Sequence, residues 1–268
     1  MLICHQHERL DSVGLAAWLA SSFSLAGIVE IRADRRRMWR AARREIARSG
    51  VIGFLDVLAM RVYARWRTRQ ADSEWIEQEV ERLRQQYPAP LNDVPRLIVR
   101  DPNSVAARTF IKALAPDFII ARCKVLLSPA VFNLARHGSY ALHPGICPEY
   151  RNAHGCFWAL ANRDLDRVGM TLLRIDRGVD TGPVLLQAGC EVDEVRESHL
   201  RIQHRVVTEN LDRIRQALLG VAAGTTRPID TTGRASAVWG QPRLTTYLRW
   251  KRAAQRDQQR LDRVPAVP

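Results

Sequence analysis

Lysine, cysteine and long apolar runs are all scarce in this sequence. Of its 268 residues 41 are Lys or Arg, and only three of these are lysines. The five cysteines are odd in number and form no C-x-x-C pair, which argues against a disulfide framework and suits a reduced cytoplasm. No run of about 18 apolar residues occurs, so no membrane-spanning helix is expected. The N-terminus lacks a basic region followed by an apolar one, so no secretory signal is expected and the predicted location is cytoplasmic.

Positive charge, in contrast, is abundant. The formal net charge is +13, which favours anionic partners unless it reflects only the composition of the source genome. Residues 32–69 hold twelve arginines against three acidic residues. One interpretation is that residues 35–69 lie on a membrane surface or hold an anionic partner. The favoured interpretation is an insertion whose arginines stay solvated while an apolar set packs on the main domain, namely Phe54, Leu55, Leu58 and Val62.

The pattern of apolar segments predicts an α/β fold. Residues 1–6 and 25–31 are expected to be strands on either side of a helix over residues 12–23, as in a parallel right-handed β-α-β unit. Residues 116–121 are expected to form a buried central strand. A long helix is predicted over residues 198–219, starting at Ser198 as N-cap. His199 and His204 on it lack the spacing of a paired metal site and are predicted to be surface or interface residues.

Residues 140–184 carry the most informative pattern. An apolar strand ends at His143, where Pro144 prevents further ladder pairing. A second buried strand is predicted over residues 168–175, followed by a turn that contains Asp180. A histidine at one strand end and an aspartate just past another can meet at one edge of a sheet, where sites form in open α/β folds.

Two segments within this stretch, ALHPGICPEYRN and GMTLLRIDRGVDTGPV, resemble the paired motifs of formyltransferases that use 10-formyltetrahydrofolate. That family acts on methionyl-tRNA, glycinamide ribonucleotide or amino sugars. The resemblance extends from about residue 115 to 186. It implies a Rossmann-like fold with a mostly parallel central sheet, a helical insertion and a short C-terminal extension. The implied domains are an α/β domain over residues 1–220, with a basic insertion at 32–90, and an extension over 221–268.

The resemblance also implies roles for individual residues. His143 donates to the oxyanion, and Asp180 holds a water or orients His143 and so draws off the amine proton. The formyl donor is 10-formyltetrahydrofolate, and no metal is expected. Its pterin ring is expected to lie against two loops, represented by Val125, Leu126, Leu127, Asp176, Gly178 and Val179.

One position departs from the family motif. The asparagine expected two residues before the histidine is Ala141 here. Loss of one oxyanion donor costs about 2.7–4 kcal/mol of transition-state stabilisation. Three readings remain open: Asn152 or His154 substitutes as donor, the enzyme is slow, or the fold serves another purpose.

The acceptor is expected to be a primary amine on a small anionic substrate, with a nucleotide-linked amino sugar as one class. About 48 residues follow Gly220, too few for the tRNA-binding barrel of around a hundred residues that the resemblance would bring. A nucleic acid partner is therefore not favoured. The alternatives are a formyl-folate hydrolase and a catalytically impaired binding protein with the same fold.

Overall fold

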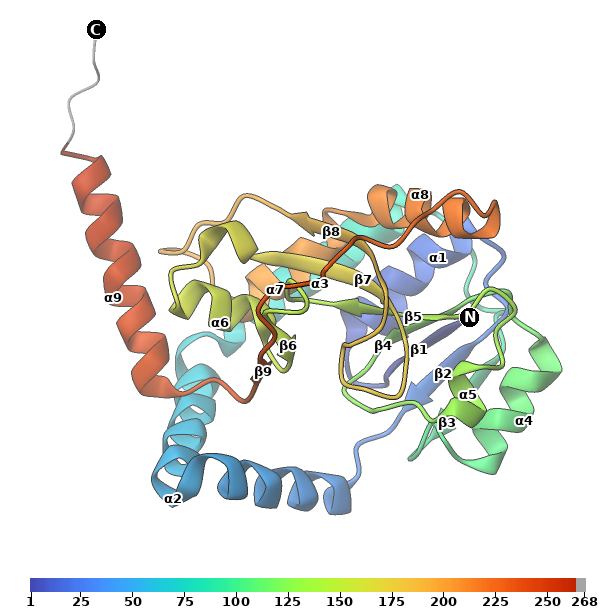
Figure 1. Ribbon diagram of the computed structural model, residues 1–268, viewed down its shortest axis with the longest axis horizontal. Helices are drawn as coiled ribbons and strands as arrows, with labels where there is room; N and C mark the ends of the chain where they lie inside the picture. Colours follow the sequence, from blue (N-terminus) through green and yellow to red (C-terminus); the bar gives the residue numbers. More distant parts are fainter. Residues whose placement is uncertain (264–268) are drawn as a thin grey trace, which may run out of the picture.

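A single seven-stranded sheet forms the centre of the molecule (Figure 1). The computed structural model describes residues 1–263, apart from the side chains of residues 35–38 and 41. The strand order is β3-β2-β1-β4-β5-β7-β8, and the first five strands are parallel while β7 and β8 are antiparallel to their neighbours. The strands are β1 (Leu2–His5), β2 (Ile28–Ile31), β3 (Arg96–Val99), β4 (Ile119–Arg122), β5 (Ser139–His143), β7 (Gly169–Arg174) and β8 (Val184–Gly189). The predicted α/β fold with a mostly parallel sheet is thus confirmed.

The strand order reverses between β1 and β4. From β1 the chain adds β2 and β3 on one side, and it then returns to place β4 and β5 on the other. The carboxyl ends of these strands therefore flank a topological switch point, where loops diverge and ligands bind in open α/β sheets. His143, the last residue of β5, lies at this edge.

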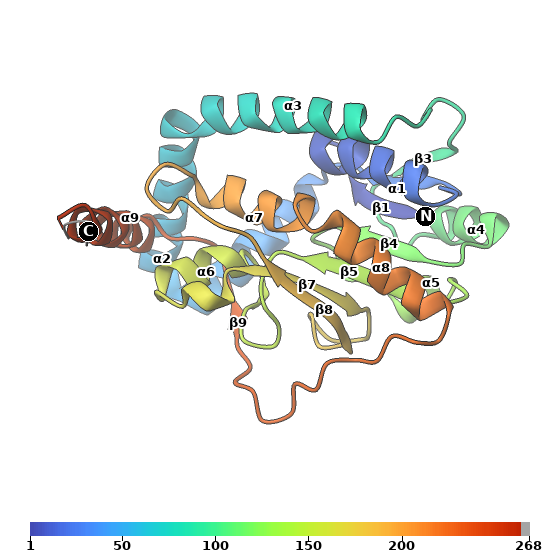
Figure 2. The ribbon, with the colours of Figure 1, turned by 90° about the horizontal axis from the view of Figure 1, so that it is seen from above.

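Helices cover both faces of the sheet (Figure 2). One face packs on α1 (Ala16–Ser22), α3 (Arg69–Gln86), α6 (Gly155–Ala161), α7 (His199–Thr208) and α8 (Leu211–Ala222), and the other packs on α4 (Val105–Leu114) and α5 (Pro129–Phe132). Two short helical segments, η1 (Leu10–Leu15) and η2 (Leu165–Arg167), complete this part of the chain. No helix within residues 1–263 combines the length and the apolar character needed to span a bilayer.

The helix predicted over residues 198–219 is divided into α7 and α8. Asn210 lies at the break, where its side-chain amide donates to the carbonyls of Val206 and Gly189. The predicted N-cap at Ser198 is confirmed, since its hydroxyl accepts from the Arg201 amide at 3.1 Å. The prediction that His199 and His204 lie at the surface is wrong, because both are buried, in a core to which the insertion also contributes.

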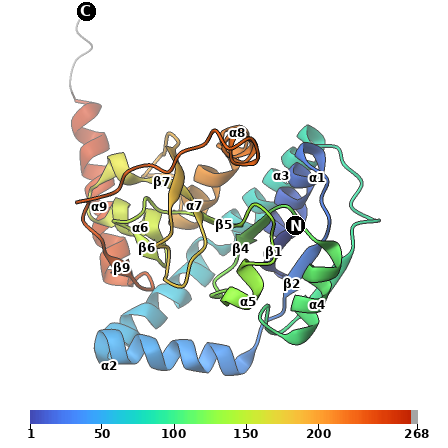
Figure 3. The same ribbon diagram turned by 45° about the vertical axis from the view of Figure 1, so that its right-hand side comes forward.

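The insertion consists of α2 (Arg35–Arg67), which is kinked at Gly50, and α3 (Figures 1 and 3). The packing predicted for α2 is wrong. Leu55 and Val62 are 56% and 59% exposed, whereas Val57 and Met60 are buried at 1% and 4%. The helix is apolar on two sides, and its contacts with α9 (Leu244–Leu261) determine which side faces inward.

The C-terminal part of the chain returns to the core. β9 (Val238–Trp239) pairs in parallel with β6 (Arg151–Asn152), the last two residues of the first motif. In α9, Tyr247, Trp250 and Ala254 are buried. These contacts join residues 238–254 to the segment that follows His143.

Candidate active site

His143 lies at the carboxyl end of β5, buried to all but 6% of its surface. Its Nε2 is 2.7 Å from the carbonyl oxygen of Tyr150. Its Nδ1 is 3.5 Å from Oδ2 of Asp180. The histidine and aspartate predicted from the two motifs are therefore neighbours at the sheet edge.

The partners of His143 determine its protonation. The Tyr150 carbonyl only accepts, so Nε2 carries a proton and donates it. The neutral ring then has a lone pair on Nδ1, opposite an acidic oxygen of Asp180. A proton on Nδ1 converts this contact into a charge-assisted one. The Nδ1 side of the ring is thus the side that faces the Asp180 carboxylate.

Asp180 is held by a tightly constrained loop between β7 and β8. The Asp176 carboxylate accepts from the Gly178 amide at 2.9 Å and from the Thr181 hydroxyl at 2.8 Å. A Cβ on Gly182 would lie 1.8 Å from the carbonyl oxygen of Arg174, so only glycine fits there. Asp180 itself has a left-handed backbone with φ +50°. The D-x-G-x-D-T-G pattern thus encodes the shape of the loop that presents Asp180.

Asn152 holds Asp180 through its backbone. With φ +76°, it points its amide N–H at Asp180 Oδ2, at 2.8 Å. Its side-chain amide donates to the carbonyl of Trp239 at 2.5 Å. The group proposed as a substitute oxyanion donor is therefore engaged with β9.

His154, the other proposed substitute, faces α7. Its Nδ1 is 3.2 Å from Oε1 of Gln203, and its ring lies 5.7 Å from that of His199. Burial, followed by the positive charge of Lys124, holds the pKa of His154 well below its usual value. A neutral imidazole donates only through the nitrogen that carries its single proton.

Ala141 lies two residues before His143, on the same side of β5. It packs against a small apolar cluster of Cys147, Leu173 and Val184. Burial raises the pKa of the Cys147 thiol, so Cys147 is a neutral apolar neighbour. The position that carries asparagine in the family motif therefore belongs to a small apolar cluster here.

The loop after β4 forms another wall of the edge. Leu126 is 60% exposed, while Val125 is half-buried and Leu127 is buried. Asn103 ties the loop together, since its side chain donates to the Leu126 carbonyl and accepts from the Ser128 amide.

Two supports of the site were not identified from the sequence. The Thr171 hydroxyl donates to the Gly145 carbonyl at 2.7 Å and accepts from the Cys147 amide at 3.0 Å, which fixes the chain after His143. Trp239 donates from its indole N–H to the Glu149 carbonyl at 2.8 Å. Thr171 is the antiparallel partner of His143, so strand pairing would have indicated Thr171 as a support of the site. No local signal in the sequence indicates Trp239.

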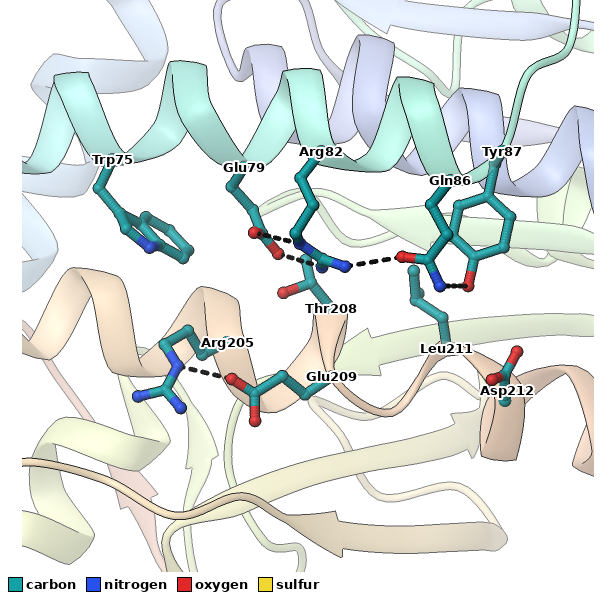
Figure 4. Close-up of a pocket in the computed structure, with 10 residues that line it drawn as sticks. All are labelled: Trp75, Glu79, Arg82, Gln86, Tyr87, Arg205, Thr208, Glu209, Leu211 and Asp212. Carbon is teal, nitrogen blue, oxygen red and sulfur yellow. Dashed lines mark hydrogen bonds and ion pairs between the residues drawn. The ribbon is translucent and has the colours of Figure 1, made fainter.

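A separate recess of about 300 Å³ lies between α3 and the α7–α8 junction (Figure 4). Its charged groups are largely paired with each other, as in the contacts of Arg82 with Glu79 and of Arg205 with Glu209, both at 2.6 Å. No residue of the two motifs lines it. Across residues 1–263 no cluster of His, Cys, Asp and Glu side chains is arranged to hold a metal ion.

Comparison with known proteins finds a family match for this chain. Residues 77–218, more than half of the chain, match the family described as formyl transferase, and this span contains His143 and Asp180. Methionyl-tRNA formyltransferase of Synechococcus sp. (strain JA-3-3Ab) is 30% identical over 163 residues, which are 60% of this chain and 49% of that protein. The counterpart from Anaeromyxobacter dehalogenans (strain 2CP-1 / ATCC BAA-258) is also 30% identical, over 61% of this chain and 51% of its own. The chain thus spans about half the length of the curated relatives it matches.

Solved structures agree on the fold. A sugar N-formyltransferase from Shewanella sp. FDAARGOS_354 superposes with a TM-score of 0.52 at 13% identity, covering 93% of this chain and 86% of that one. Phosphoribosylglycinamide formyltransferase from Anaplasma phagocytophilum gives a TM-score of 0.51 at 14% identity, covering 90% and 97%. With the family match over residues 77–218, the chain belongs to the formyl transferase family.

Proposed function

We propose that this protein transfers a formyl group from 10-formyltetrahydrofolate to a primary amine of a small anionic substrate. The observation that carries the proposal is the contact between His143 and Asp180 at the carboxyl edge of the sheet, in a chain of this family. The relatives named above are methionyl-tRNA, sugar and phosphoribosylglycinamide formyltransferases, and all three classes of acceptor are amines.

In the proposed mechanism, His143 stabilises the negative formyl oxygen and Asp180 accepts the proton that the attacking amine loses. A proton on Nδ1 of His143 stabilises the negative charge that develops on the formyl oxygen as the amine attacks. The nitrogen of the tetrahedral intermediate must then lose a proton, which the Asp180 carboxylate accepts directly or through a water. As the intermediate collapses, the bond between the formyl carbon and the donor nitrogen of the folate would break, and that nitrogen would leave with the proton as tetrahydrofolate. The Asn152 amide holds the carboxylate during these steps.

The proposed donor fits the loops at this edge. The exposed side chain of Leu126 offers an apolar surface for a flat pterin ring, and the loop is fixed by Asn103. The loop over residues 176–182, with Asp176, Gly178 and Val179, is fixed by its own hydrogen bonds and by the contact of Arg151 with the Val179 carbonyl at 3.2 Å. Bound there, 10-formyltetrahydrofolate supplies the formyl group.

Cations near the edge support an anionic acceptor. Lys124 follows β4 and Arg61 lies on α2, and both are exposed. The positive charges of both act on His154, together with burial, to lower its pKa. Cations from two separate elements thus approach one side of the site, which suits a phosphate-bearing amine such as a nucleotide-linked amino sugar.

Calorimetry with a stable formyl-folate analogue tests the donor. Micromolar binding is expected for the natural sequence, and His143→Ala is expected to retain binding while it abolishes transfer. An exposed histidine, His7→Ala, is the matched control. No binding by a folded sample would exclude the loops at 123–128 and 176–182 as a pterin site and with them formyl transfer.

Activity assays distinguish the acceptor and the role of Ala141. Formyl transfer is expected to an amino-sugar nucleotide or a glycinamide-type amine, and release of formate without acceptor would instead identify a hydrolase. If another donor already serves the oxyanion, Ala141→Asn should change the rate by no more than a few-fold. A rise of about 10²–10³-fold would identify the natural protein as catalytically impaired.

A further inference from the structure

The second arm of α2, after the kink at Gly50, exposes a continuous apolar stripe to solvent. The stripe consists of Val51 (65% exposed), Leu55 (56%), Leu58 (37%), Val62 (59%) and Trp66 (87%). Successive members are three or four residues apart and therefore share one side of the helix. Ile52 (85%) extends it at the kink, and Trp39 (72%) is exposed on the first arm.

The opposite side of α2 is fixed in place. Val57 and Met60 are buried, and Tyr63 packs on Tyr247 of α9 with ring centroids 5.5 Å apart. The Asp56 carboxylate accepts from both the amide and the hydroxyl of Thr245, at the start of α9. The helix cannot turn its outer stripe inward without losing these contacts, so the stripe stays on the surface.

Two arginines without carboxylate partners, Arg61 and Arg65, lie along one side of the stripe. In the described part of the chain, no ion pair is formed by the exposed arginines of α2 other than Arg48, namely Arg40, Arg43, Arg44, Arg61, Arg65 and Arg67. The two acidic residues of the helix are already engaged, Glu45 with Arg48 and Asp56 with Thr245. The outer side of this arm is therefore apolar along its middle and carries uncompensated positive charge along one margin.

This combination distinguishes between the occupants that such a surface could have. A second copy of the chain would bring the same arginines against each other, which like-charge repulsion opposes. A nucleic acid would neutralise the arginines but would leave the apolar stripe in water, since phosphates dominate that binding. An anionic bilayer matches both features, because acyl chains accept the apolar stripe and headgroups pair with the arginines.

We infer that the outer side of α2 docks this protein on an anionic lipid surface. The stripe Val51–Leu55–Leu58–Val62–Trp66 enters the boundary between headgroups and acyl chains, where tryptophan is favoured. Arg61 and Arg65 lie at headgroup level, and their apolar stems extend the contact. This inference does not rest on the proposed formyl transfer, although Arg61 would serve both the lipid surface and the anionic acceptor.

Sedimentation with large unilamellar vesicles tests the inference. The natural protein is expected to bind phosphatidylcholine vesicles containing about one third phosphatidylglycerol, and to bind pure phosphatidylcholine at least about tenfold more weakly. The triple variant Leu55→Gln, Val62→Gln, Trp66→Gln should lower the partition coefficient about tenfold or more. The matched control replaces three exposed apolar residues on other helices, Val105→Gln, Leu219→Gln and Leu261→Gln, and should bind like the natural protein.

A charge variant, Arg61→Gln, Arg65→Gln, keeps the apolar stripe and tests the inference if the apolar variant does not fold. Its binding should also fall about tenfold, and about 0.5 M NaCl should have a similar effect on the natural protein. Absence of vesicle binding, or equal loss in the control, would overturn the inference. So would a dimer in analytical ultracentrifugation that the stripe variant abolishes, or binding to RNA that displaces the vesicles.

Discussion

The edge of the sheet around His143 and the outer side of α2 differ in the surroundings of their side chains. At the edge, polar groups are buried and engaged: His143 contacts Tyr150 and Asp180, and Asn152 binds both Asp180 and Trp239. On α2, apolar side chains such as Leu55 and Trp66 are exposed.

The comparison separates two kinds of constraint. A polar group in the interior must find its hydrogen-bond partner within the fold, since an unpaired buried group is costly. The edge around His143 can therefore be tested by removing one charge or by adding one carbon atom to a glycine. An exposed apolar stripe adds little to the stability of the isolated chain, so its removal should leave folding intact. The following predictions test this difference, from the largest effect to the smallest.

The largest effect is expected at Asp180. Asp180→Asn keeps an acceptor for the Asn152 amide but removes the negative charge opposite His143. Formyl transfer should fall about 10²–10⁴-fold in kcat/KM, because the amine proton loses its acceptor. Kinetics of the variant beside Asp166→Asn, an exposed carboxylate, check this. Undiminished transfer by a variant with an unchanged melting temperature would remove Asp180 from the mechanism.

The next largest effect is a difference in stability between substitutions on the two sides of α2. Met60→Ala empties a buried position and should lower the free energy of unfolding by about 2–5 kcal/mol. Leu55→Ala, at an exposed position of the same helix, should change it by less than about 0.5 kcal/mol. Urea denaturation of both variants measures the difference. Equal losses would show that the stripe contributes to the core after all.

Two glycines extend the comparison to the backbone. Gly182→Ala places a Cβ 1.8 Å from the Arg174 carbonyl, so the Asp180 loop must shift, at about 1–3 kcal/mol and with loss of activity. Gly50→Ala meets no neighbouring atom but has φ +70°, so it should cost about 1 kcal/mol and leave activity unchanged. Thermal melting with activity assays tests both, and the reverse order would contradict the loop geometry.

The effect that is smallest at neutral pH concerns His199, which lies among Phe157, His154 and Tyr247. Burial lowers the pKa of His199 from its ordinary 6.5 to about 3. Below pH 6.5 the unfolded chain takes up a proton that the folded protein does not, so the free energy of unfolding falls by about 1.4 kcal/mol per pH unit down to about pH 3.

His199→Leu should remove this contribution and flatten the dependence of stability on pH below 6.5. His204, whose pKa burial also lowers to about 3, keeps its own share. Urea titrations at pH 7, 6 and 5 measure the slope, with exposed His7→Leu as control. An unchanged slope would mean that His199 gains a proton in the folded protein.

The sequence allowed the sheet and the relation of the two motifs to be predicted, because both depend on short-range patterns. The strand predicted over residues 116–121 and the end of β5 at His143 follow from apolar runs closed by turn residues. The fold and the family are confirmed by the sheet topology and by the match over residues 77–218. The roles of His143 and Asp180, and those of the two pterin loops, stay predictions.

Long-range packing accounts for what the sequence did not reveal. Both Leu55 and Met60 are apolar, and only contact with α9 decides which faces inward. His199 and His204 read as surface residues because their burial depends on packing with other elements. The hydrogen bond of the Asn152 side chain could likewise not be predicted, since its partner Trp239 lies 87 positions away.

That distance matters while the chain is being made. The ring of Trp239 stacks on those of Tyr150 and Trp158, with centroids 5.6 and 4.8 Å apart, and its carbonyl accepts from the Asn152 side-chain amide. β9 therefore holds the segment that positions His143 and Asp180. The ribosome releases residue 239 long after both motifs, although domains begin to fold as they emerge. A nascent chain can therefore carry a formed sheet and both motifs while the site is still open. Catalytic competence would then arrive late in synthesis, after the fold itself.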